Sequence, residues 1–139
     1  MTDPLIAASR AAANGLFAQS TRMRVVSENI ANSDSTGKTA GADPYRRKTV
    51  NFESVADDVS GVDLVKVEDI SQDQAPFRTE YMPGHPAADA KGMVKLPNVD
   101  MLTELADMRE ASRSYTANTQ VIKQVREIVS MTIDLLRQS

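Results

Sequence analysis

The 139-residue chain contains no cysteine and no tryptophan, and only 4% of its residues are aromatic. Without cysteine, the sequence excludes a disulfide framework, a thiolate metal site and a cysteine nucleophile. The hydrophobic fraction of 41% depends on alanine and valine, which bury little area per residue. We therefore expect the fold to need stabilising contacts beyond one dense core.

Long apolar runs are also missing. No stretch approaches the roughly 18 consecutive apolar residues that a membrane-spanning helix requires, so direct membrane insertion is not expected. Arg10 and Asn14 interrupt the apolar N-terminal segment, which argues against a cleaved Sec signal peptide. A formal charge of −3 gives no general attraction for nucleic acid or for an anionic membrane. The expected partners are other proteins.

Histidine occurs once, at position 85. With Asp89 four residues on, His85 could be a general base with an orienting carboxylate, as in a hydrolase. Its place between Gly84 and Pro86 favours a turn residue instead, because no nucleophile or ligand cluster accompanies it at a suitable spacing. We predict no catalytic residue, no metal site and no cofactor.

Charged clusters in the middle of the chain can also be interpreted either as functional sites or as structural features. The acidic pairs at 57–58 and 68–69 could suggest acid–base chemistry or calcium binding, but adjacent residues on a strand point to opposite faces, which favours a solvated surface. The basic cluster at 46–48 could contact nucleic-acid phosphates. Three cations in an acidic segment favour salt bridges at a strand edge or between subunits.

The N-terminal segment predicts one long amphipathic helix. Asp3 followed by Pro4 is a helix start signal, because aspartate caps free N–H groups and proline fits the first helical position. Apolar and small side chains then recur every three or four residues as far as Ile30. We expect the helix to run from about residue 4 to about residue 32, where a polar run at 32–37 ends it.

The C-terminal segment predicts a longer helix. After Pro97, either Asn98 or Asp100 can cap it, and an apolar stripe then follows a four-three alternation to Leu136. A second stripe from Val121 to Leu135 widens the apolar face in the last turns. One partner helix cannot cover that much circumference, so additional copies or other proteins are expected to contact it.

Between the helices, residues 38–97 hold five of the six prolines and four of the six glycines. Extended segments are predicted at 45–52, 62–70, 77–82 and 93–96, and an ordered turn at 83–92. The expected class is α+β, with long terminal helices forming a coiled-coil-like domain around a small β-rich insert. We divide the chain into 1–35, the N-terminal helix with its end motif; 36–97, the insert; and 98–139, the C-terminal helix packing on the first.

The lengths of these segments predict unequal stability. The helices are expected to extend beyond any core that so short an insert can supply, and isolated helices gain most of their stability from packing. We therefore expect the ends to be partly unfolded in the monomer and to become ordered on assembly. A coiled-coil interaction or regulatory protein remains an alternative reading.

Several motifs resemble the bacterial flagellar axial proteins, the family of rod and hook subunits. Residues 31–37 (Ala-Asn-Ser-Asp-Ser-Thr-Gly) are similar to the motif that ends the family's first helix, with Ser35 where threonine is usual. Residues 44–48, 83–92 and 96–100 fall in the order expected of a proximal rod protein of the basal body, although Met93 and Leu96 stand where aromatic residues are expected. Residues 108–118 resemble the shared motif of the last helix.

The resemblance implies a structural subunit that polymerises through its terminal helices into a helical tube, transmitting torque and passing exported subunits. It implies synthesis in the cytoplasm, export through the flagellar type III apparatus without a cleaved signal, and assembly into the rod in the periplasm. The implied partners are copies of itself, other rod proteins, the base-junction protein and the surrounding rings. The expected assembly contacts are Leu5, Leu16, Met23, Val26, Ile30, Asn32, Leu105, Tyr115, Asn118, Ile122, Val125, Val129, Ile133 and Leu136.

Overall fold

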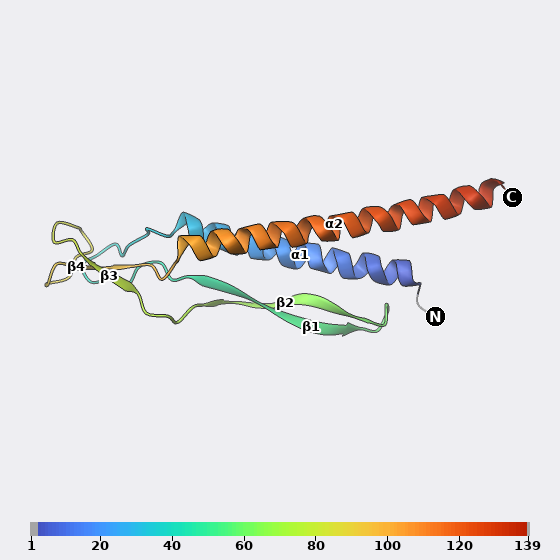
Figure 1. Ribbon diagram of the computed structural model, residues 1–139. Coiled ribbons are helices and arrows are strands. Elements are labelled where there is room, and N and C mark those ends of the chain that lie inside the picture. The colour runs from blue at the N-terminus through green and yellow to red at the C-terminus, as the bar shows by residue number, and fades with distance from the viewer. Residues whose placement is uncertain (1–2, 139) are drawn as a thin grey trace.

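The computed structural model describes residues 3–138 as an elongated molecule with a helix at each end of the chain and strands between them (Figure 1). The elements follow one another as α1 (Pro4–Ala31), β1 (Lys48–Asp57), β2 (Val62–Gln72), β3 (Arg78–Tyr81), β4 (Met93–Leu96) and α2 (Met101–Gln138). This arrangement confirms the α+β class predicted from the sequence.

Acidic side chains cap the first turns of both helices, as the sequence predicts. Asp3 accepts a hydrogen bond from the backbone N–H of Leu5 at 2.9 Å, and Pro4 takes the first helical position. Asp100 accepts from the Thr103 hydroxyl at 2.6 Å, and this hydrogen bond lowers the pKa of the Asp100 carboxyl group. The Asp100 carboxylate therefore stays charged at neutral pH, and its negative charge interacts favourably with the positive end of the helix dipole.

The polar run after α1 is a compact turn. The Asn32 side chain donates to the Glu28 carbonyl at 2.8 Å, and its Oδ1 accepts from the Ser35 hydroxyl at 3.0 Å. Gly37 is required sterically, since a Cβ there would lie 2.6 Å from the backbone oxygen of Ala42. The physical role of the motif at 31–37 is to end α1 and turn the chain toward the insert.

The two helices run antiparallel, and α2 continues beyond the N-terminal end of α1 (Figure 1). At about 1.5 Å per residue, the 28 residues of α1 span roughly 42 Å and the 38 residues of α2 roughly 57 Å. We use the name distal segment for residues 126–137 of α2, where every side chain is exposed.

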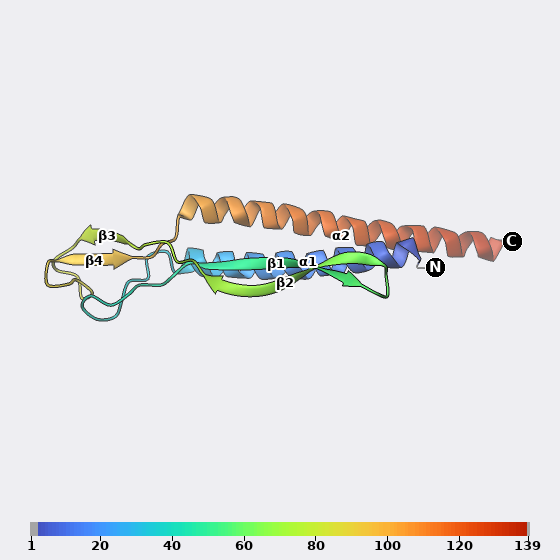
Figure 2. The ribbon, with the colours of Figure 1, turned by 90° about the horizontal axis from the view of Figure 1, so that it is seen from below.

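Strands β1 and β2 form a long antiparallel hairpin that lies along α1 (Figures 1 and 2). Pairing runs from Lys48 opposite Gln72 to Asp57 opposite Val62, with a bulge after Asn51. About ten residues at 3.3 Å each give a ribbon of roughly 33 Å, which covers most of α1. The expectation that the insert is too short to cover the helices is therefore wrong for α1.

The same hairpin corrects a strand boundary. The sequence predicts a strand at 45–52, whereas β1 begins at Lys48 and continues to Asp57. Its second half carries polar and acidic side chains because that part of the hairpin faces solvent on one side, which hides a strand from a reading of hydrophobicity. Within the described residues the hairpin packs on α1 but not on α2.

Strands β3 and β4 form a second, short hairpin at the opposite end of the molecule from the distal segment (Figures 1 and 2). The connection at 83–92 is an ordered turn, as predicted, in which the Met82 N–H donates to the Gly92 carbonyl at 2.9 Å. Gly92 has φ +75°, and a Cβ there would lie 2.9 Å from the Tyr81 ring. Only glycine fits that position without strain.

The core is built from small side chains. The buried apolar residues are Ala12, Ala18, Val25, Val26, Leu64, Ala87, Val94, Val99 and Ala111. Alanine and valine bury little area each, so the hydrophobic term per residue is modest. Stability must draw on the buried polar contacts described next.

Candidate assembly interface

The contact between α1 and α2 is a narrow seam of small and polar residues. Gly15 and Ala111 are buried in it. A Cβ on Gly15 would lie 2.6 Å from Nδ2 of Asn118, so the two helices approach closely there. Near the other end, Arg22 donates to Asp107 at 2.9 Å. Such a seam permits close packing but leaves many of the larger apolar side chains of α2 exposed.

The apolar stripe predicted on α2 lies beside this seam for most of its length. The seam passes through Glu104, Ala111 and Asn118, while Leu105 is 44% exposed and Tyr115 is 39% exposed. Further along, Ile122 and Val125 are half-buried, and Val129, Ile133 and Leu136 are exposed. The helix pair therefore leaves much of the stripe on the surface.

The expected contacts on α1 occupy mixed environments. Val26 lies in the intramolecular core, whereas Leu5, Leu16, Met23 and Ile30 are half-buried. The half-buried Asn32 belongs to the turn that ends the helix.

Sequence reasoning missed two large exposed apolar side chains on α1. Phe17 is 67% exposed and Ile6 is 55% exposed. Phe17 could have been found from the sequence, since it is an aromatic residue outside the apolar stripe of the helix. A large apolar side chain is costly to leave in water, so its position there indicates a partner.

The distal segment is apolar over much of its circumference. Exposed fractions are 59% for Met131, 50% for Ile133, 70% for Leu135 and 72% for Leu136. At 100° per residue these side chains, with Ile128 and Val129, span more than half of the helix surface. Apolar exposure of that width fits more than one neighbouring helix.

A buried polar cluster joins both helices to the insert. Asn29 and Glu104 are both 0% exposed. The Asn29 side chain donates to Glu104 Oε2 at 3.0 Å and to the Lys48 carbonyl at 2.9 Å, and its Oδ1 accepts from the Tyr45 hydroxyl and the Lys48 N–H, each at 2.9 Å. Arg47 pairs with the other oxygen of Glu104 at 2.5 Å. Every polar group of the Asn29 side chain therefore has a partner.

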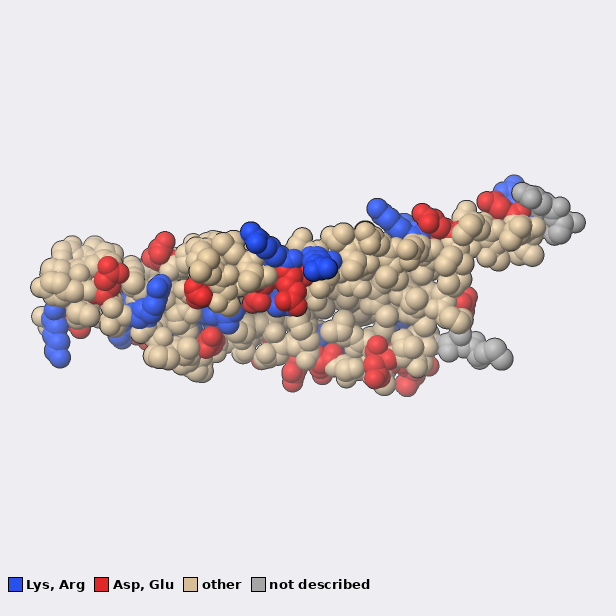
Figure 3. Space-filling model, viewed as in Figure 1, with Lys and Arg blue, Asp and Glu red and all other residues tan. Residues whose placement is uncertain are grey.

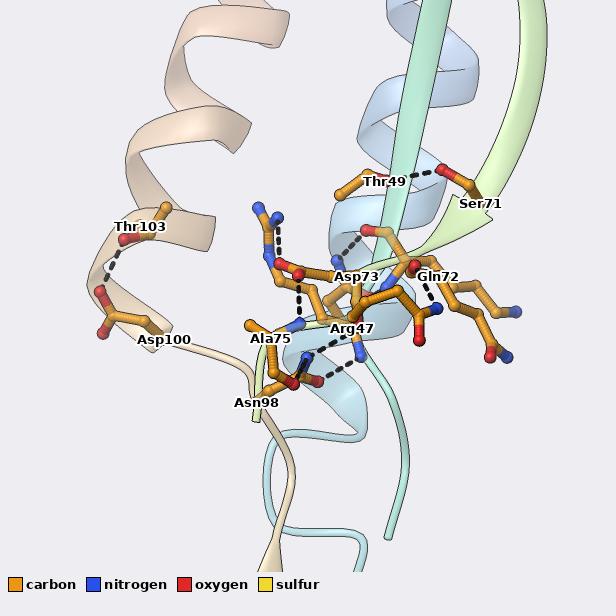
Figure 4. Close-up of polar contacts among 12 residues, drawn as sticks. Arg47, Thr49, Ser71, Gln72, Asp73, Ala75, Asn98, Asp100 and Thr103 are labelled. Atoms are coloured by element: carbon orange, nitrogen blue, oxygen red, sulfur yellow. Dashed lines mark hydrogen bonds and ion pairs between the residues drawn. The ribbon is translucent and has the colours of Figure 1, made fainter. Parts of the chain in front are cut away.

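Arg47 also anchors the base of the long hairpin (Figure 4). Its backbone N–H donates to Asn98 Oδ1 at 2.8 Å, and the Asn98 amide donates to the carbonyls of Asp73 at 3.0 Å and Ala75 at 3.1 Å. The Arg47 guanidinium lies 3.5 Å from the Asp73 carboxylate. These contacts tie the start of β1, the segment after β2 and the approach to α2 into one junction.

The basic cluster at 46–48 is used inside the chain. Arg46 lies over the Phe77 ring at 4.1 Å from its centroid, and Lys48 pairs with Glu28 at 3.0 Å. With Arg47 bound to Glu104, all three cations have intramolecular partners. The predicted salt bridges are found within the chain at the start of β1, where α1, α2 and the segment after β2 supply the carboxylates, and salt bridges between subunits stay a prediction.

The polar groups considered for catalysis have structural contacts. His85 Nδ1 accepts a hydrogen bond from the Ala87 N–H at 3.1 Å within the turn at 83–92. Asp89 accepts from the backbone N–H groups of Met93 and Lys91, which lowers the pKa of its carboxyl group. In the part of the chain that the structure describes, no three or more potential ligand side chains gather to hold a metal ion. None of the described helices is long and apolar enough to cross a membrane.

The two helices share an uncharged middle section. Residues 11–21 of α1 and 114–122 of α2 contain no charged side chain, and the contact of Gly15 with Asn118 places them side by side. We call these residues the uncharged belt. In Figure 3 the charged side chains gather around the start of α2, along the hairpin and at the far end of α2, with an uncharged expanse between. Burying this surface against another helix costs less desolvation free energy than burying a charged surface would.

Comparison with known proteins agrees with this architecture. A family profile described as flagella basal body rod protein matches residues 10–37, and one described as flagellar basal body rod FlgEFG protein C-terminal matches residues 90–135. These ranges cover most of α1 and most of α2.

Three relatives that match nearly the whole chain have the same name. The chain is 64% identical over 137 residues to the flagellar basal-body rod protein FlgC of Agrobacterium fabrum, with 99% of each chain covered. It is 44% identical to FlgC of Escherichia coli O6:H1, covering 89% of this chain and 92% of the relative, and 35% identical to FlgC of Bacillus subtilis, covering 88% and 92%. The chain therefore belongs to the FlgC family of flagellar basal-body rod proteins, structural subunits of the rod.

Proposed function

We propose that this chain is a non-enzymatic subunit of the proximal rod that polymerises through α1 and α2 into the wall of a helical tube. In that tube it transmits torque and lines the path of exported subunits. The observation that carries the proposal is the row of exposed apolar side chains along α2, which the fold of one chain leaves in water. Neighbouring copies and other rod proteins would cover it.

The proposed contacts are those expected from the sequence, with emphasis on the exposed ones. Burying half-exposed isoleucine or valine side chains yields roughly 1 kcal/mol each at 25 cal/mol per Å², so a row of them supports association. The uncharged belt and the distal segment are the parts of this surface that we propose pack against neighbours. Residues 1–35 and 98–139 would form the tube wall, and residues 36–97 its outer contacts.

A charge placed in the distal segment tests the proposal. Val129 is 41% exposed and Ile133 is 50% exposed, so Val129→Asp or Ile133→Asp should leave the isolated chain folded. In a packed tube, either aspartate would be a buried unpaired charge, which is strongly destabilising. We expect normal expression but loss of motility, and absence of the protein from isolated basal bodies.

The matched control is Ser130→Asp, which adds the same charge in the same turn but outside the apolar sector. It should retain motility. Normal motility and normal incorporation of Val129→Asp and Ile133→Asp would contradict the proposed interface. Loss of motility in all three variants would show an effect of added charge in general.

We also propose that the chain is made in the cytoplasm and passes through the flagellar type III apparatus, without cleavage, to the periplasmic rod. The absence of cysteine supports this route, because an unfolded chain entering an oxidising compartment cannot then form wrong disulfides. Mass spectrometry of the protein from isolated basal bodies should find its N-terminal peptide uncleaved. Contacts with the base-junction protein and the surrounding rings belong to the same proposal, and cross-linking in intact basal bodies would test them.

A further inference from the structure

The seam between α1 and α2 has contacts at even intervals along α1. Gly15 lies against Asn118, Arg22 contacts Asp107, and Asn29 contacts Glu104. The three α1 positions are seven residues apart, and small or uncharged side chains fill much of the space between them. Small side chains interlock less than large ones do, so we expect specific polar contacts to contribute to the choice of axial offset.

The polar cluster at the end of the seam does not tolerate such a slide. One turn moves a residue by about 5.4 Å along the axis, whereas a hydrogen bond tolerates only a few tenths of an ångström. A shifted α2 would withdraw Glu104 from both Asn29 and Arg47, leaving a carboxylate that is 0% exposed without its donors. An unpaired buried charge is strongly disfavoured.

Arg47 makes this selection depend on a third element. It belongs to the insert, and its backbone is held by Asn98 and its side chain by Asp73 as well as by Glu104. Contacts with both α1 and the base of the hairpin therefore fix the axial position of α2. Buried polar contacts that admit a single register are a known device in helix pairs.

We propose that Asn29, Glu104 and Arg47 form a register lock, which allows one axial offset of α2 on α1 and so sets how far the distal segment projects. The lock is a property of the single chain and can be measured on it. Its consequence for assembly rests on the function proposed above: a slide of one turn would move the apolar sector of the distal segment by about 5.4 Å relative to α1 and the part of the uncharged belt that α1 carries.

Engineered disulfides in the cysteine-free chain report the offset directly. Gly15→Cys with Asn118→Cys marks the native register, since the two sites touch. Gly15→Cys with Ser114→Cys or Ile122→Cys marks a slide of about one turn in either direction. These two shifted pairs also carry Asn118→Ala, which removes the amide that a Cβ at position 15 would meet. All pairs are oxidised on the dilute chain and quantified by mass spectrometry.

The expected result is a single offset in the otherwise unaltered chain and a mixture when the lock is made apolar. In Asn29→Leu with Glu104→Leu, the shifted disulfides should rise at least about tenfold, while helix content is retained. Glu104→Gln keeps the shape of the side chain and one of its two acceptor oxygens, so it retains a polar contact at this position and should still favour the native offset. This control separates loss of polar selection from substitution as such.

A folded double-leucine variant that still forms only the 15–118 disulfide would overturn the proposal. If that variant does not fold, the single Glu104→Leu variant decides in the same way. Unfolding of the single variant as well would also overturn it, because the cluster would then hold the helices together without choosing between registers. If Val129→Asp proves motile while the register result holds, the assembly proposal fails and the lock stands.

Discussion

Replacing Asn29 with alanine should destabilise the chain more than any other single change of an asparagine. The side chain makes four hydrogen bonds: it donates to the Lys48 carbonyl and to Glu104, and it accepts from the Lys48 N–H and the Tyr45 hydroxyl. A neutral hydrogen bond contributes roughly 0.5 to 1.5 kcal/mol and one to a charged group roughly 1.5 to 3 kcal/mol. Allowing for partial relaxation and water entry, we expect a loss of about 3 to 5 kcal/mol in the free energy of unfolding.

That loss is large on the scale of a small protein, whose total stability is about 5 to 15 kcal/mol. Urea unfolding of the dilute chain, followed by far-UV circular dichroism, measures it as a shift in the transition midpoint at constant slope. The matched control is Asn14→Ala in the same helix. Asn14 is half-buried and makes one hydrogen bond, to the Arg10 carbonyl at 3.0 Å, so its loss is offset by the better helix propensity of alanine.

We expect the control to stay within about 1 kcal/mol of the parent chain. If Asn29→Ala and Asn14→Ala shift the midpoint equally, the buried cluster does not stabilise the fold and the reasoning from its geometry is refuted. A change in slope for Asn29→Ala alone would indicate that the helix pair opens before the rest of the chain unfolds.

Three further predictions follow from local geometry. Gly37→Ala should cost about 1 to 3 kcal/mol in unfolding free energy, because its Cβ would lie 2.6 Å from a backbone oxygen, whereas Gly84→Ala has open space and should be neutral; equal midpoints would contradict this. The Ser60 hydroxyl lowers the pKa of the Asp57 carboxyl group, so the stability that this carboxylate contributes is complete above about pH 4 and is lost as the pH falls through the lowered pKa. In a plot of the urea midpoint against pH, Asp57→Asn should flatten the acidic part of the curve, and an unchanged curve would exclude the contribution. The sequence predicts that both ends are partly unfolded in the monomer, but the hairpin lies along α1 and leaves the distal segment uncovered. Hydrogen exchange on the dilute chain should therefore find amides of residues 126–137 exchanging fastest and those of α1 protected, and equal protection would contradict this reasoning.

Local signals were enough to predict the ends of the helices. Asp3 with Pro4, Asp100, and the glycine-ended turn at 31–37 act within a few residues of the backbone groups that they satisfy, so their effect does not depend on the rest of the fold. The same is true of the ordered turn at 83–92, where the Gly92 backbone conformation is set locally.

The full length of the long hairpin could not be predicted from local sequence signals. Strand β1 continues to Asp57 through residues such as Glu53 that are poor strand signals, because its partner strand and the surface of α1 provide the stabilisation. An alternation of apolar and polar side chains is weak when the sheet has two strands and one solvated face.

The candidate interface divides in the same way. By itself the sequence determined that both helices are amphipathic and that α2 has more apolar surface than one partner can cover, because helical periodicity places side chains on faces without reference to any neighbour. Only the tertiary structure decided which face forms the seam. Gly15, Asn29 and Glu104 define it, although the sequence pattern favoured the larger apolar residues next to them. Close approach and satisfied buried polar groups depend on residues far apart in the chain, such as 29, 47 and 104, which no periodicity connects.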